Sequence, residues 1–110
     1  MNVMVSNAAY PAYDGSPSPA LFSKRIVRGL LRRTLGFHGV VVTDSMEAPA
    51  SGTRADAPAR AISAGVDLLL YTSERSALDG YRRLLVRARA RPDLRRELLA
   101  SYGRVISLKR

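Results

Sequence analysis

The chain has 110 residues, of which 46% are hydrophobic, and it contains no cysteine. We therefore expect a folded domain, and we exclude a disulfide framework and thiolate metal sites. No apolar run approaches the ~20 residues that a membrane-spanning helix needs, and the amino terminus carries no visible targeting signal.

The formal net charge is +9, because 18 lysines and arginines face 9 acids. A charge of this size suggests a polyanionic partner. The basic residues, however, gather on the polar sides of two helical patterns, at 24–33 and 82–96, without interleaved aromatic residues or a nucleic-acid-binding motif. This distribution favours solvated helix faces, so we expect no nucleic-acid partner. A small basic module that binds nucleic acid or an acidic surface is the alternative function.

The chain begins with a short apolar segment, Met1 to Ser6, which we predict to be a strand. Turn-forming residues follow it between positions 11 and 19, so the strand leads into a loop. Ser23 then suits the N-cap of a helix over Lys24 to Leu35. In this helix apolar residues recur every three to four positions, and basic residues take the other face.

A helix end and a buried strand follow. Gly36 suits a left-handed helix C-cap, and Gly39 gives a second flexible point before the strand Val40 to Thr43. Because the valine run has no polar alternation, we expect both faces of the strand to be covered, as in a parallel sheet flanked by helices. Asp44 then lies at the carboxyl end of the strand, where α/β enzymes place their chemistry. The structural alternative for Asp44 is helix capping or the satisfaction of loop amides.

The next segments repeat the order of helix and strand. A flexible loop runs through Ser51 to Thr53, and a helix spans about Ala57 to Ala64 and ends at Gly65. The apolar run Val66 to Tyr71 predicts a third strand.

Two helices complete the chain, one over Glu74 to Ala90 and a last one that begins at Pro92. Their apolar residues recur at helical spacing. The residues predicted to face inward are Leu78, Tyr81, Leu84, Leu85 and Ala88 in the first helix and Leu94, Leu98, Tyr102, Val105 and Ile106 in the second.

The predicted element order is β-α-β-α-β-α-α. This order is typical of the α/β class, with parallel strands joined by right-handed crossovers. We find no tandem repeat and no internal domain boundary in the sequence, so residues 1–110 are expected to form one unit.

Three sequence patterns together resemble the glycoside hydrolase family 3 N-terminal domain. Gly36 to Asp44 follow the pattern Gly-Phe-x-Gly-Val-Val-x-Thr-Asp, the helical Leu30-Leu31-Arg32 precedes it, and Ala61 to Leu70 follow the pattern Ala-x-x-Ala-Gly-x-Asp-Leu-Leu-Leu. The resemblance is closest to the β-N-acetylhexosaminidase branch. It covers nearly the whole chain but only the last part of the family's domain.

The resemblance implies a fold and a role for one residue. The fold is a partial (β/α)₈ barrel, in which this chain supplies strands six to eight as the C-terminal part of the domain. Asp44 matches the family's catalytic nucleophile, which implies retaining hydrolysis of O-glycosyl bonds, with terminal β-N-acetylhexosamine residues as the expected substrate. The carbohydrate is the expected partner.

The second catalytic group is absent from these 110 residues. In hexosaminidase-like relatives it is a histidine held by an aspartate, in a motif upstream of the part represented here. The single histidine, His38, precedes the strand that Asp44 follows, roughly 20 Å away along an extended segment, so it is predicted to be a structural loop residue. We therefore expect the isolated chain to be inactive. Because three strands cannot close a barrel, we also expect self-association through exposed strand faces.

Two other residues are candidates for substrate binding. Met46 follows the nucleophile closely and lines the sugar pocket or packs the loop; Tyr10 stacks on a sugar or fills the junction between strand and loop. Glu47 is predicted to solvate the loop. Many relatives carry a histidine shortly before the Tyr-Pro pair, where this chain has Ser6 to Ala9.

The remaining acids do not suggest a metal site. Asp56 and Asp67 are predicted to be structural, the first as a helix N-terminal charge and the second in the turn into a strand. One histidine and scattered acids give no metal-ligand spacing, and no glycine-rich phosphate loop is present, so we expect no metal or cofactor.

Overall fold

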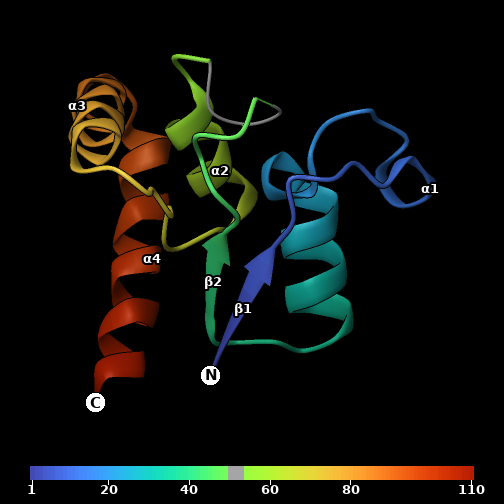
Figure 1. Ribbon diagram of the computed structural model, residues 1–110. Helices are drawn as coiled ribbons and strands as arrows, with labels where there is room; N and C mark the ends of the chain where they lie inside the picture. Colours follow the sequence, from blue (N-terminus) through green and yellow to red (C-terminus); the bar gives the residue numbers. More distant parts are fainter. Residues whose placement is uncertain (50–53) are drawn as a thin grey trace.

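The computed structural model describes residues 1–49 and 54–110 (Figure 1). The loop predicted at Ser51 to Thr53 lies outside the described residues. The elements, in chain order, are β1 (Asn2–Val5), α1 (Pro11–Asp14), η1 (Ala20–Phe22), η2 (Arg25–Thr34), β2 (Val40–Thr43), α2 (Ala57–Ala64), α3 (Glu74–Ala90) and α4 (Pro92–Lys109). None of the described helices is both long enough and apolar enough to cross a membrane.

Strands β1 and β2 form a parallel pair at the centre of the molecule (Figure 1). Met4 pairs with Val42, and Val5 pairs with Thr43. Val40, Val41 and Thr43 are fully buried, but Val42 is half-buried and its partner Met4 is 56% exposed, so the expectation that both faces are covered is met only in part. The predictions of these two strands and of their parallel arrangement are confirmed.

The predicted third strand, Val66 to Tyr71, is wrong as a regular strand. It lies beside β2 but forms a single isolated parallel bridge, between Val42 and Leu68. Two features interrupt the backbone hydrogen bonding between this segment and β2. The Leu70 N–H donates to the Thr43 hydroxyl at 2.9 Å instead of to a carbonyl. The Val41 carbonyl accepts from both the Asp67 and the Leu68 N–H groups. Leu68 and Leu70 are 40% and 38% exposed, whereas Val66 is fully buried.

Helix η2 has π-helical hydrogen bonding, in which an N–H donates to the carbonyl five residues earlier, as Leu35 does to Leu30 at 2.9 Å. Lys24, directly before η2, is already helical, and the Ser23 hydroxyl that precedes it accepts from the Ile26 N–H at 3.1 Å, as predicted for an N-cap. Gly36 has a φ of +70° and follows the helix end, as predicted for a left-handed C-cap.

Gly39 serves a different purpose from the one predicted. Its φ is not positive, but a Cβ atom at this position would lie 2.6 Å from the Met1 carbonyl oxygen and 2.7 Å from the Phe37 ring. A glycine is therefore needed here for close approach of two backbone segments rather than for flexibility.

The main core lies on one side of the sheet. It joins Val5 and Val41 of the strands to Val27 of η2 and Ala61 of α2, so both crossover helices pack on the same face. A second cluster, made of Ala59, Ile62, Ala88 and Leu94, holds α2, α3 and α4 together.

The predicted inward faces of α3 and α4 are partly wrong. Leu78, Tyr81 and Tyr102 are 46%, 62% and 65% exposed. The buried positions of α3 are Ala88, as predicted, and Gly80, which was not predicted. They lie on one helix face because they are eight residues apart. Small residues allow close packing, and Gly80 packs directly against Tyr71.

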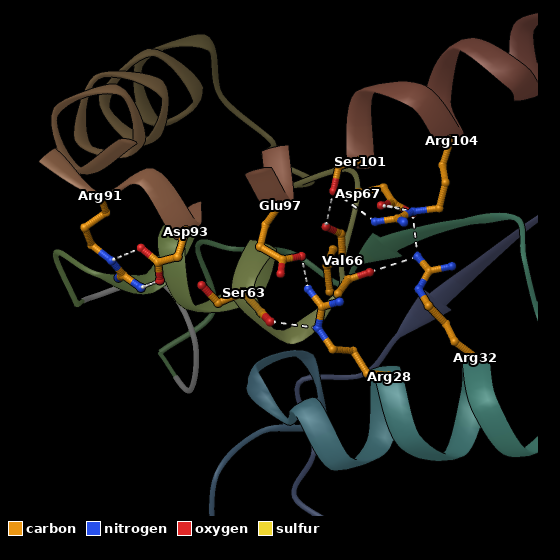
Figure 2. Close-up of polar contacts among 11 residues, drawn as sticks. Arg28, Arg32, Ser63, Val66, Asp67, Arg91, Asp93, Glu97, Ser101 and Arg104 are labelled. Carbon is orange, nitrogen blue, oxygen red and sulfur yellow. Dashed lines mark hydrogen bonds and ion pairs between the residues drawn. The ribbon is translucent and has the colours of Figure 1, made fainter. Parts of the chain in front are cut away.

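A buried ion network joins the helices at the amino end of β2 (Figure 2). The side chain of Asp67 is 0% exposed and pairs with Arg32 at 2.7 Å and with Arg104 at 2.8 Å. It also accepts from the Val41 N–H at 2.9 Å. Burial lowers the pKa of Arg32, and the charge of Asp67 opposes that effect. Asp67 is thus bonded to three elements: η2, β2 and α4.

Candidate active site

Asp44 lies directly beyond the carboxyl end of β2. Its backbone N–H donates to the Val5 carbonyl at 2.9 Å, so the parallel pairing with β1 extends one residue past the strand. One carboxylate oxygen accepts from the Ser45 N–H at 2.7 Å. The side chain is half-buried and forms no ion pair with any residue of 1–49 or 54–110. Its position is therefore fixed while its charge is not neutralised by a cation of the described chain.

Asn7 follows β1 at the same end of the sheet and contacts the Asp44 loop. Its amide nitrogen donates to the Ser45 carbonyl at 3.2 Å. Because a carbonyl can only accept, this bond fixes the orientation of the amide. The side-chain amide oxygen of Asn7, Oδ1, is buried and has no hydrogen-bond partner in the described residues. Asn7 therefore holds the backbone next to Asp44 and keeps one acceptor unused.

Glu47 ties the same loop to the start of α3. Its two carboxylate oxygens accept hydrogen bonds from the backbone N–H and the hydroxyl of both Thr72 and Ser73. Bonds from the Thr72 side chain and backbone are the main cause of a Glu47 pKa lowered to about 2. A carboxylate that accepts several such bonds is strongly favoured in its ionised form. Glu47 thus links the loop after β2 to the segment after Tyr71.

The two predicted substrate-binding residues lie at this end of the sheet but differ in exposure. Met46 is 2% exposed and belongs to the main core, where its backbone N–H donates to the Leu70 carbonyl at 2.9 Å. Tyr10 is 44% exposed and directly precedes α1. The roles of both residues in binding a sugar stay predictions.

His38 is exposed and lies before β2, at the end of the strand opposite to Asp44. It is the single histidine of the sequence. The described part of the chain therefore brings no histidine to Asp44, and the second catalytic group expected from the resemblance is not found beside it.

Sequence reasoning missed the structural roles of Asn7 and Glu47. A signal was available, since each residue follows a predicted strand closely and the carboxyl ends of parallel strands meet at one edge of the sheet. The sequence does not show which backbone groups two such side chains reach, because that depends on how the loops fold back on each other.

The comparison with protein families gives one match over nearly the whole chain. The model described as the glycosyl hydrolase family 3 N terminal domain matches residues 1–108. Among curated relatives, a beta-hexosaminidase of Pseudomonas aeruginosa is 30% identical over 104 residues, which cover 92% of this chain and 31% of the relative. A beta-hexosaminidase of Bordetella avium is 33% identical over 105 residues, with 93% and 29% covered.

Solved structures give the same result. The β-N-acetylhexosaminidase of Beutenbergia cavernae superposes with a TM-score of 0.86 at 36% identity, over 98% of this chain and 33% of that protein. A family 3 β-N-acetylglucosaminidase of a Paenibacillus strain gives a TM-score of 0.83 at 30% identity, over 98% and 21%. The chain thus spans at most about a third of the length of these relatives.

Proposed function

Because this chain belongs to the glycosyl hydrolase family 3 N-terminal domain family, we propose that it is the C-terminal part of a (β/α)₈ barrel that hydrolyses terminal β-N-acetylhexosamine residues. In this proposal residues 1–110 supply the last three strand positions of the barrel: β1, β2 and the irregular segment Val66 to Tyr71. The substrate follows from the names of the relatives, which are beta-hexosaminidases and β-N-acetylhexosaminidases.

The position of Asp44 is the observation that carries the proposal. Catalytic residues of such barrels lie at the carboxyl ends of strands, and Asp44 directly follows β2 in a loop held by Asn7 and Glu47. A nucleophile must be ionised, and it must keep a fixed direction toward the anomeric carbon. The bonds to Val5 and Ser45 supply that direction.

The proposed mechanism is retaining and proceeds in two steps. Asp44 attacks the anomeric carbon as the C–O bond to the leaving group breaks, and a second group protonates the departing oxygen. That group then removes a proton from water, which attacks the glycosyl-enzyme and releases Asp44. Retention requires the two groups to lie about 5–5.5 Å apart. Since the second group is not found beside Asp44, we propose that it lies outside residues 1–110 and that the isolated chain is inactive.

The test uses a restored barrel, in which residues 1–108 replace the matching third of the Beutenbergia cavernae enzyme. With Asp44 intact, this chimera should hydrolyse 4-nitrophenyl N-acetyl-β-D-glucosaminide. Asp44→Ala should abolish turnover without changing the circular dichroism spectrum. Asp44→Glu should lose on the order of a hundredfold, because the attacking oxygen moves by ~1 Å.

Added azide distinguishes loss of the nucleophile from damage to the fold. It should restore some turnover to Asp44→Ala and yield a glycosyl azide of inverted configuration, since the small anion attacks where the carboxylate was. The assignment of Asp44 fails if Asp44→Ala keeps more than a few per cent of turnover without azide. The proposed function fails if the folded chimera with Asp44 intact is inactive.

A further inference from the structure

Three adjoining hollows follow helix α3 and share their walls. Their volumes are about 410, 480 and 280 Å³. Arg82 and Arg83 line both the first and the second hollow, and Arg87 and Arg91 line both the second and the third. We call the surface formed by these neighbouring hollows the arginine trough, defined by Arg54, Arg75, Arg82, Arg83, Arg87 and Arg91. From Arg75 to Arg91 it follows α3 for roughly 24 Å.

The acids that line the arginine trough are already bound within the chain. Asp79 pairs with Arg83 at 2.9 Å, and Asp56 pairs with Arg54 at 3.2 Å. The Glu47 carboxylate accepts the hydrogen bonds from Thr72 and Ser73.

Three arginines of the trough are left without such a partner. Within residues 1–49 and 54–110, Arg75, Arg82 and Arg87 form no ion pair. Arg75 and Arg82 are exposed, and Arg87 is half-buried. The trough therefore offers spaced guanidinium groups to an external anion, and a guanidinium fork suits a carboxylate because it can bind both oxygens at once.

We propose that the arginine trough binds an acidic oligosaccharide whose carboxylates pair with Arg75, Arg82 and Arg87. The choice of a glycan rests on the proposed function, whereas the place and the charge of the site rest on the trough itself. The first hollow is lined by Met46 and Glu47, which follow Asp44 in the sequence, so a glycan in the trough approaches the same loop that carries the candidate nucleophile.

The aromatic residues of the trough favour a glycan over a nucleic acid. Single-stranded nucleic acids bind largely by stacking bases on exposed aromatic rings. Tyr71 lines the first hollow but is packed on Gly80, where a Cβ atom would lie 2.2 Å from its hydroxyl oxygen. Phe22 lines the third hollow, but it is 9% exposed and Arg60 lies over its ring at 4.5 Å. Neither ring is free to stack on a base.

The test measures binding of a fluorescently labelled hexamer of galacturonic acid to the 110-residue chain by anisotropy at 0.1 M salt. Arg75→Gln combined with Arg82→Gln is the trough variant. Arg96→Gln combined with Arg110→Gln is the control, because it removes the same charge from exposed positions that do not line the trough. The Debye length of ~10 Å at this salt concentration limits the influence of the distant control charges.

The trough variant should raise Kd by on the order of tenfold, which corresponds to two lost ion pairs. The control should change Kd by less than about twofold. An equal loss in both variants would show attraction by net charge alone and would overturn the site. Tighter binding of a thymidylate hexamer, or equal binding of a neutral N-acetylglucosamine hexamer, would overturn the choice of an acidic glycan.

These outcomes are independent of the turnover test. If Asp44→Ala keeps its turnover, the proposed function fails and the binding constants are unaffected. If both variants bind the hexamer like the unmodified chain while Asp44→Ala is inactive, the trough proposal alone fails.

Discussion

The two ends of strand β2 hold their acidic side chains in opposite ways. At the amino end, Asp67 is buried and paired with Arg32 and Arg104. At the carboxyl end, Asp44 is half-buried and bonded to the Ser45 N–H, while Glu47 is bonded to Thr72 and Ser73 in a partly exposed loop. The first end joins helices to the sheet, and the second joins loops to each other.

This difference suggests why chemistry is placed at one end of a barrel strand. A buried charge must be fully paired, and removing one partner is costly. A carboxylate at the amino end is therefore committed to the fold. At the carboxyl end the loop is fixed by hydrogen bonds from neighbouring residues, so the fold does not need an ion pair of Asp44 within the described residues, which is what the proposed nucleophile requires.

The largest effect is expected from removing the buried acid. Asp67→Ala leaves Arg32 and Arg104 without their partner and should lower the free energy of unfolding by about 3–5 kcal/mol, measured by urea denaturation followed by circular dichroism. Asp56→Ala is the matched control, since its pair with Arg54 is exposed and should contribute about 0–1 kcal/mol. Equal losses in the two variants would remove the contrast between a buried and an exposed pair.

At acid pH, the smaller contribution of Glu47, at the carboxyl end of β2, to the stability of the fold should become measurable. The pKa of Glu47 is lowered from 4.5 to about 2, so its ionised form stabilises the fold at pH values above its unfolded pKa. This contribution is lost as pH falls through the folded value, that is, between about pH 4.5 and 2. Thermal melts of Glu47→Gln should therefore change less over this window than those of the unmodified chain.

A control for this prediction lies in the first turn of α3, next to the Ser73 that Glu47 contacts. Glu74→Gln removes a neighbouring exposed acid of the first turn of α3, and it should keep the pH dependence of the unmodified chain. An NMR titration of the Glu47 carboxyl group with an apparent pKa near 4.5 would contradict the hydrogen bonds that Glu47 accepts from Thr72 and Ser73.

The smallest effect is expected at His38. It is exposed at the amino end of β2, so His38→Ala should change the free energy of unfolding by less than ~0.5 kcal/mol and leave turnover of the restored barrel unchanged. A large loss of turnover in that variant would mean that the amino end takes part in the reaction, and the comparison between the two ends would fail.

Local signals in the sequence predicted most of the elements. Ser23 and Gly36 mark a helix start and a helix end through their own side-chain and backbone preferences, and both are found where expected. The valine run of β2 predicted a buried parallel strand for the same reason. Because the strand was predicted to end at Thr43, the position of Asp44 at its carboxyl end was predicted as well.

The errors arise where a contact depends on a distant residue. The Thr43 hydroxyl accepts from the Leu70 N–H. The sequence of 66–71 cannot predict that a side chain of β2 replaces a backbone carbonyl as the acceptor. Likewise, Gly80 carries no apolar side chain, so a hydrophobic pattern cannot show that α3 packs through it against Tyr71. The hydrogen bond between Glu47 and Thr72 could not be predicted for the same reason, because the two residues lie far apart in the sequence.

The irregular segment Val66 to Tyr71 lies beside β2 at the edge of the sheet, so its backbone determines how a second chain could associate there. A regular edge strand presents N–H and C=O groups at an even repeat, which is a template for adding another strand. The bonds of Asp67 and Thr43 disrupt that repeat on the side that faces β2, so the backbone of this apolar stretch is not expected to present an even repeat. Association through this edge is therefore expected to bury the exposed leucines of one face rather than to extend the sheet.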